Sequence, residues 1–275
     1  MNPIYRGESL RLHSPGLWWD QANYTDMIGQ AKYRYFFDDF EALAGLTMVT
    51  QVADQGWITT QDTGVTLIGA NDDDIGELEA AGMDADNDEF ILARDLAFHK
   101  MEQERKLWFE ARVKKADITD DTAMFVGMAW DAGGNRPVPA GFLIDDTGGI
   151  ITGATGMSYI GFHVDIAAAA TVDFVYGAEG QAAQIAQAGI ATMVADTYIK
   201  LGFKYDKGKY GADGRVSIWI DGTLKADREI TQANIEAATF PEDELLTPTF
   251  TMKINGTPDT GGAIDWIACM SELNA

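Results

Sequence analysis

Short apolar segments of strand length recur along the chain from residue 46 onward, and glycine and aspartate separate them. Residues 106–114 (KLWFEARVK) alternate between apolar and polar side chains, which is the period of a half-buried β-strand. Residues 197–206 and 215–224 lie on either side of a glycine-rich turn and predict a β-hairpin. Many short strands joined by polar turns predict an all-β fold, and we expect a β-sandwich.

Two segments do not follow this pattern. Residues 76–81 predict a weak turn of helix within a long acidic loop region, and residues 180–192, rich in alanine and glutamine, predict either a loop or a short helix. The other expected strands are 57–60, 64–69, 124–130, 159–164, 171–176, 249–254 and 263–270.

The first 45 residues contain aromatic clusters joined by polar sequence, with neither a helical period nor strand alternation. We therefore predict an N-terminal arm over residues 1–45 and a β-sandwich domain over residues 46–275. The arm either lies as a strap across its own sandwich or reaches a neighbouring subunit, because aromatic side chains are frequent hot spots of interfaces. The predicted partner-binding residues are Trp18, Trp19, Tyr33, Tyr35, Phe36, Phe37 and Phe40.

The formal net charge is −23, from 43 acidic and 20 basic residues. Such a surface repels phosphate backbones and anionic lipids, so neither nucleic acid nor a membrane is expected as a partner. A basic partner surface and a saline habitat would each account for the charge. No apolar run approaches the ~18 residues of a membrane-spanning helix, and the first residues lack the layout of a signal peptide.

Patterns for metal binding are weak. The three histidines are far apart and no Cys-x-x-Cys pair occurs, so zinc is not expected. His163 and Asp165 would share one face of a strand, where a hydrogen-bonded histidine is favoured over a metal ligand. Residues 71–74 and 84–89 offer oxygen ligands of the kind calcium takes, but they lack the glycine and terminal glutamate of an EF-hand. We expect solvated acidic loops and no metal or cofactor.

Several segments together resemble the concanavalin A-like lectin and laminin-G jelly roll, over residues 92–273. They are LWFEARVK at 107–114, FVG at 125–127, LGFKYD at 201–206, VSIWIDG at 216–222 and AIDWI at 263–267. The resemblance implies a concanavalin A-like jelly-roll β-sandwich, here behind an extended aromatic-rich N-terminal arm. It implies little about activity, since this fold hosts lectins, glucanases and structural modules.

Retaining glycosidases of this fold resemble one another in a Glu-x-Asp-x-x-Glu strand, which sets two carboxylates ~5–5.5 Å apart. Residues 102–104 and 117–121 hold the nearest candidates, and neither has that spacing. Glu110 stands singly on its strand. Cys269, the single cysteine, lies in an apolar stretch without an evident histidine partner and is expected to be a small buried hydrophobe. From these patterns we expect a protein that is not an enzyme and has no catalytic residues.

The whole chain, with its aromatic segment ahead of a sandwich, also resembles capsid decoration (cement) proteins of tailed bacteriophages. This resemblance implies a structural virion protein, made in the host cytoplasm, that binds the major capsid protein and neighbouring copies of itself as a homo-oligomer. The alternative is a carbohydrate-binding module of a phage fibre or bacterial surface complex. In that case Trp108, Trp130 or Trp219 would stack on surface glycans, although a tryptophan in a sandwich more often belongs to the core.

Overall fold

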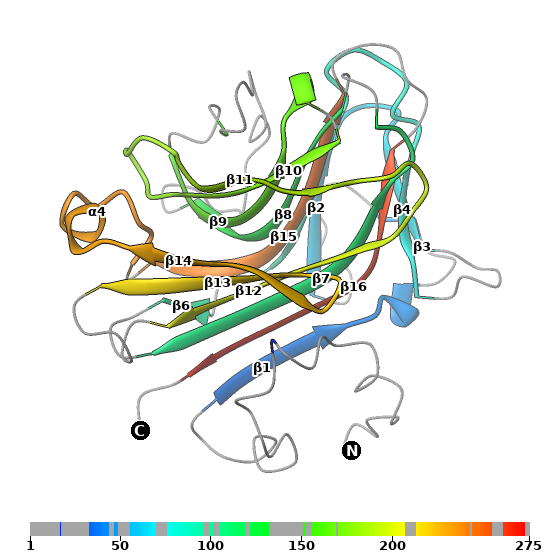
Figure 1. Ribbon diagram of the computed structural model, residues 1–275. Coiled ribbons are helices and arrows are strands. Elements are labelled where there is room, and N and C mark those ends of the chain that lie inside the picture. Colours follow the sequence, from blue (N-terminus) through cyan, green and yellow to red (C-terminus); the bar gives the residue numbers. More distant parts are fainter. Residues whose placement is uncertain are drawn as a thin grey trace.

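The structure is a computed structural model in which two antiparallel sheets face each other (Figure 1). No helix in the described part of the chain is long and apolar enough to cross a membrane. The residues described are 17, 33–43, 47–48, 56–69, 76–95, 99–101, 105–118, 122–131, 151, 156–168, 170–206, 213–242, 244–254 and 261–272.

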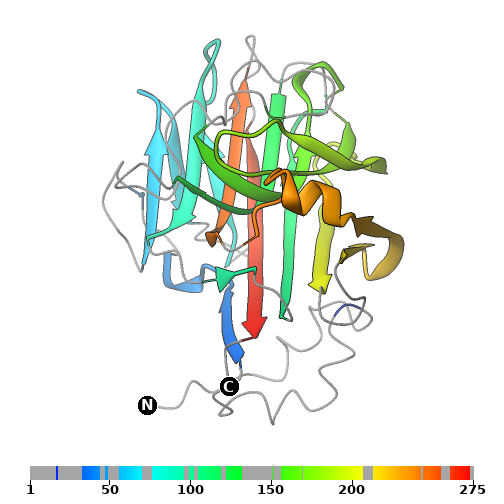
Figure 2. The same ribbon diagram turned by 90° about the vertical axis from the view of Figure 1, so that its left-hand side faces the viewer.

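One sheet, sheet A, is built around the long strand β16, which pairs with β7 along one side. Its other side is shared, because β4 pairs with the first part of β16 and β1 with the remainder (Figure 2). In spatial order sheet A contains β14 (Thr223–Ile230), β13 (Gly214–Ile220), β12 (Ile199–Asp206), β7 (Lys106–Lys115), β16 (Gly262–Glu272), β4 (Leu78–Ala81) and β3 (Thr66–Gly69), with β1 (Tyr33–Asp38) beside β16.

The second sheet, sheet B, has β8 and β15 near its centre and short helical turns in its connections. In spatial order it contains β11 (Gln184–Thr192), β10 (Thr171–Gly177), β9 (Met157–Val164), β8 (Thr122–Asp131), β15 (Leu245–Ile254), β5 (Glu89–Arg94) and β2 (Trp57–Gln61), with β6 (His99–Lys100) beside β15. The helical pieces are η1 (Glu41–Leu43), η2 (Ile166–Ala168) and α4 (Gln232–Glu236), which Thr231 caps.

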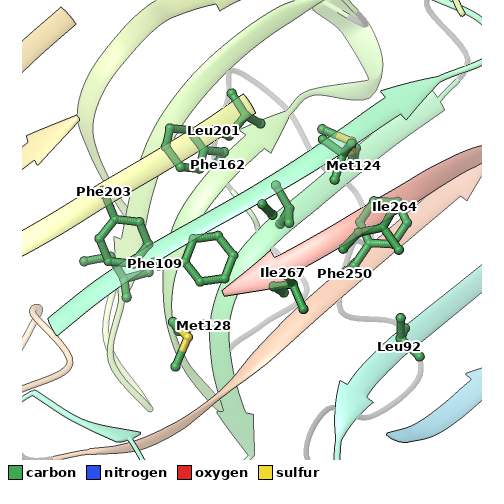
Figure 3. Close-up of a cluster of buried hydrophobic side chains, with 14 of the residues drawn as sticks. Leu92, Phe109, Met124, Met128, Phe162, Leu201, Phe203, Phe250, Ile264 and Ile267 are labelled. Carbon is green, nitrogen blue, oxygen red and sulfur yellow. The ribbon is translucent and has the colours of Figure 1, made fainter. Parts of the chain in front are cut away.

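The core lies between the inner faces of the two sheets, where alternate residues of each strand meet (Figure 3). Phe109 of β7 stacks on Phe203 of β12 with ring centroids 5.4 Å apart, and Phe174 of β10 meets Phe203 edge-on at 5.3 Å. Each fully buried aromatic or aliphatic side chain contributes about 1.5–3 kcal/mol to folding, so this layer dominates the stability. The predicted all-β jelly-roll sandwich is confirmed.

Two local predictions were wrong. The expected helical turn at 76–81 contains β4, in which Leu78 and Ala80 are buried and Glu79 is exposed, and this alternation matches a strand. The segment at 180–192 contains β11, which pairs with β10. Alanine, glutamine and glutamate favour helices in isolation, but pairing with a neighbouring strand overrides that preference. The division of the chain at residue 45 stays a prediction, and β1 from the first part is a strand of sheet A.

Candidate functional site

The aromatic residues predicted to bind a partner lie in different environments. Trp18 and Trp19 are outside the described residues, and Tyr33 begins β1 with a side chain that is not described. Tyr35 and Phe37 are half-buried against the outer face of sheet A. The ring centroids of Phe37 and Trp266 lie 6.3 Å apart there.

Phe36 and Phe40 instead pack on Trp57, with ring centroids 5.8 and 5.3 Å from it, and Phe40 is fully buried. The indole N–H of Trp57 donates to Asp38 Oδ2 at 2.8 Å, and the Arg94 guanidinium lies 4.7 Å from the centre of the Phe36 ring. These contacts hold β1 on its own sandwich. The partner-binding role of the seven aromatic residues stays a prediction.

A second apolar layer covers the outer face of sheet A. Trp108 and Trp266 are fully buried there and Trp219 nearly so, packed with Leu17. Gly202 makes room for Leu17, because a Cβ at Gly202 would lie 2.6 Å from Leu17 Cδ2. The members of this outer layer are Leu17, Trp108, Trp219, Trp266, Ala268 and Met270, with Tyr35 and Phe37 at its border.

Of the tryptophans considered for sugar stacking, Trp108 and Trp219 are therefore buried in this layer. Trp130, at the end of β8, is half-buried. Trp130 also packs against the inner core, so all three tryptophans fit the expectation that a tryptophan in a sandwich is part of its packing.

A polar cluster at one corner of the same outer face combines charged groups with an aromatic ring. Arg112 and Lys114 project outward from β7 and lie 4.1 and 5.1 Å from the centre of the Tyr198 ring. Lys114 Nζ forms a 2.8 Å ion pair with Glu77, and Arg112 pairs with Asp265. We call these five residues the Tyr198 corner.

Different elements supply the members of the Tyr198 corner. Glu77 precedes β4 and Tyr198 precedes β12, while Asp265 occupies the irregularity in β16 where its register with β7 shifts. A bulge of this kind re-aims one side chain, here toward β7. The alternation of β7 predicted that Arg112 and Lys114 point outward. Nothing in the sequence indicated their neighbours, which lie far away along the chain.

Burial and neighbouring charges shift the protonation equilibria of this corner. Burial raises the pKa of Asp265 although Arg112 opposes this, and burial and Glu77 together raise the pKa of Tyr198. Burial would lower the pKa of Lys114, but the hydrogen bond and charge of Glu77 outweigh it and raise that pKa. The side chains of Arg112, Asp265 and Lys114 are 37, 24 and 22% exposed. The corner therefore offers charged donors and acceptors to solvent.

The outer face of sheet B holds the predicted neighbours His163 and Asp165. His163 pairs with Phe125 of β8 on one side and with Asp173 of β10 on the other. The two carboxylates near His163 accept backbone hydrogen bonds: Asp165 Oδ1 from Ala167 N–H at 3.0 Å, and Asp173 Oδ1 from Gly189 N–H at 2.5 Å. All three polar residues are buried. In the described residues, no three His, Cys, Asp or Glu side chains gather as they would around a metal ion.

Cys269 is buried, and the structure places a histidine beside it that the sequence did not indicate. Cys269 Sγ lies 2.9 Å from His99 Nε2, and His99 Nδ1 lies 3.0 Å from Ser271 Oγ. Burial lowers the pKa of His99 to about 3 and raises the pKa of the Cys269 thiol well above its usual value. Both groups are therefore neutral at pH 7, and neither reaches solvent.

Comparison with known proteins identifies the fold. No family model and no curated protein matches the chain. Among solved structures, peanut lectin is similar with a TM-score of 0.53 and 13% identity, over 89% of this chain and 100% of that one. An endo-1,3-β-glucanase from Streptomyces sioyaensis has a TM-score of 0.55 and 14% identity, over 88 and 97%. A protein of unknown function from Shewanella oneidensis MR-1 has a TM-score of 0.52 and 14% identity, over 95% of both chains.

The expectation that this protein is not an enzyme is contradicted by the comparison. The glucanase matches nearly the whole sandwich, so enzymes share this fold. The missing Glu-x-Asp-x-x-Glu spacing therefore does not exclude this chain from the enzymes of the fold. At 13–14% sequence identity the similarity concerns the backbone fold and does not extend to the site residues. The protein has the concanavalin A-like jelly-roll fold of the lectins and glucanases.

Proposed function

We propose that the protein is a carbohydrate-binding module and that the Tyr198 corner is its binding site. The fold is shared with a lectin and a glucanase, whose names both refer to carbohydrate. The observation that carries the proposal is the corner itself, where donors and acceptors surround one half-buried aromatic ring at the protein surface.

The chemistry of the corner fits a sugar. Each sugar hydroxyl both donates and accepts hydrogen bonds, and here Arg112 and Lys114 donate while Glu77 and Asp265 accept. The half-buried ring of Tyr198 adds an apolar surface, while its hydroxyl oxygen is buried. Two cations and two carboxylates sum to zero formal charge, so a neutral glycan fits the corner without the repulsion that the net charge of −23 imposes on an anionic one.

The outer face of sheet B is less suited to this role. Phe125 and Tyr159 are buried there, and Tyr159 O–H donates to the Ile151 carbonyl at 3.5 Å. Apolar side chains thus occupy the centre of that face. In the Tyr198 corner, Arg112, Lys114 and Asp265 keep part of their side chains in solvent, while Glu77 is buried. A ligand would meet the exposed parts of Arg112, Lys114 and Asp265 first, without displacing packed apolar side chains.

A glycan array followed by calorimetry tests the proposal. The wild type should bind a defined neutral glycan, and Asp265→Asn and Tyr198→Ala should each weaken binding about tenfold or more, since each removes a charge-assisted bond or the stacking surface. Asp227→Asn is the matched control, because Asp227 forms an exposed ion pair with Arg215 at 3.1 Å at the other edge of sheet A. Glycan binding that survives both corner substitutions, or no binding to any glycan, would overturn the assignment.

A second candidate function is that of a capsid decoration protein at the virion surface, bound to the major capsid protein. Tyr35 and Phe37 favour it, because these two predicted partner-binding side chains share the outward face of β1 and remain half-exposed. Purified protein should then bind expanded capsids of its phage and raise their resistance to heat. The Phe37→Ala variant should bind less, and Leu224→Ala, exposed on β14, should bind normally. Failure of the wild type to bind such capsids would count decisively against this role.

A further inference from the structure

One edge of sheet B carries a surface strip without charged residues. Residues 180–195 contain no Asp, Glu, Lys or Arg, although 23% of the chain is charged. The strip comprises β11, the last strand of sheet B, and its flanking turns. The edge strand of sheet A on the same side is β14, and four of its eight residues are charged: Lys225, Asp227, Arg228 and Glu229.

The strip is at the surface. Ala188, Gly189 and Thr192 are exposed, and Val194 keeps 59% of its surface in solvent. Edge strands of natural proteins are usually blunted by charged residues, which discourage contact with other chains. Charged residues of this kind are present on β14, and β11 has none. An uncharged, partly apolar edge on a chain of net charge −23 indicates a surface that meets another protein surface.

Exposed Glu179 and Asp196 border the strip at its two ends, and within the described residues the side chains of Asp173 and Arg228 bond to it directly. Asp173 Oδ1 accepts the Gly189 N–H, and Arg228 Nε donates to Gln187 Oε1 at 2.6 Å. Asp173 and Arg228 carry opposite charges, so the central part of the strip stays close to neutral, and the two carboxylates lie only at its ends. Long-range repulsion between two copies is therefore weakest when their strips face each other.

We propose that two copies of the chain associate through the residue 180–195 strip, in a two-fold symmetric contact. The inference does not depend on carbohydrate binding. In a two-fold contact each surface meets itself, and a charged surface of one sign would repel its own copy whereas an uncharged one does not. A charged partner protein would instead be expected to require complementary charges, which the strip lacks.

The shape of β11 determines what kind of contact forms. Its register with β10 shifts twice, and Gly189 adopts φ +58° at the irregularity. Bulges bend an edge strand and interrupt the regular ladder that a further strand would extend. The contact is therefore made by side chains across the strip and closes as a dimer rather than growing into an open sheet.

Sedimentation equilibrium tests the dimer. The wild type should dimerise, and Val194→Glu and Ala188→Glu should each weaken the dimer about 100-fold or more, because the symmetry brings two like charges into one contact. Leu224→Glu is the matched control: it places the same charge on β14, where Leu224 is 52% exposed, and should leave the dimer unchanged. Circular dichroism melting of each variant shows that it is folded.

Ionic strength gives an independent readout. Salt screens repulsion between two acidic copies, so the dimer should tighten between about 0.05 and 0.5 M sodium chloride, the range in which the Debye length falls several-fold. A wild type that stays monomeric at high salt would overturn the proposal. So would a Leu224→Glu variant that dissociates as readily as Val194→Glu, or a dimer that weakens as salt is added.

Discussion

Ionisable side chains inside the sandwich are surrounded by packed protein atoms, whereas several side chains of the Tyr198 corner reach solvent. His99 lies between Cys269 and Ser271 with both ring nitrogens engaged. Lys115 is the last residue of β7, and its Nζ donates to the Thr122 carbonyl of β8 at 2.6 Å. Burial lowers the pKa of Lys115 to about 7. Such residues join neighbouring elements only while they remain neutral or well paired.

The stability of the fold should fall in mild acid because of His99. In the unfolded chain this histidine binds a proton near pH 6.5, whereas in the folded chain its pKa is about 3, so the unfolded state gains the proton first. This group should lower the free energy of unfolding by about 2 kcal/mol between pH 7 and pH 5. Urea unfolding at pH 7, 6 and 5 measures the slope.

The His99→Gln variant provides the comparison, since glutamine keeps a polar side chain but does not titrate. Its unfolding free energy should be lower than that of the wild type at pH 7 and should vary less between pH 7 and 5. The variant differs from the wild type at this one position, so the difference between the two pH profiles reports His99. Parallel pH profiles for the two proteins would show that His99 does not cause the acid sensitivity.

At the scale of elements, the curvature of sheet B depends on glycines. Figure 1 shows β8, β9 and β10 bending so that the face turned away from sheet A is concave. Gly127 and Gly161 oppose each other on that face, and the Phe125 ring lies over both, within about 3 Å of where their Cβ atoms would be. Tyr159 covers Gly177 in the same way. Side chains converge on a concave face, and glycine leaves the space that the aromatic rings fill.

Gly161→Ala should therefore destabilise the sandwich by about 1–3 kcal/mol. The new Cβ would lie 2.5 Å from the Val126 carbonyl oxygen and 2.7 Å from Gly127 Cα, and backbone atoms cannot move aside cheaply. Gly156→Ala is the control, because no heavy atom lies within 4 Å of its added Cβ. Chemical denaturation of both variants compares them, and equal losses would mean that the close approach of β8 and β9 is not limiting.

At the scale of the whole molecule, the dominant electrostatic quantity is the net charge of −23. Repulsion among like charges disfavours the compact state, and salt screens it. The melting temperature should therefore rise by about 2 °C or more between low salt and ~0.3 M sodium chloride, which corresponds to about 1 kcal/mol for a chain of this size. The Val194→Glu variant should show the same rise, which separates screening from dimerisation. A fall in melting temperature would mean that attractive ion pairs outweigh the repulsion.

Strand positions were predictable from alternation of apolar and polar residues or from a short, continuous apolar run. The alternation in residues 106–114 located β7 and its inward face, and the apolar run at 124–130 located β8. The predicted half-buried character was only partly right, because Trp108 and Glu110 on the outward face of β7 are also buried. Residues 76–81 and 180–192 were predicted wrongly, because they contain helix-favouring residues at sheet edges where pairing decides the conformation. The Tyr198 corner could not be predicted, since its charges come from segments that only the sheet order brings together.

The sequence alone determined the all-β class, the burial of Cys269 and the excess of negative charge, because alternation, apolar context and composition are local or additive properties. Only the tertiary structure decided which residues became neighbours. It placed β1 on the sandwich, His99 beside Cys269, and Glu77 and Asp265 around Tyr198. These contacts depend on strand order and register, which arise from many weak long-range pairings that no single segment encodes.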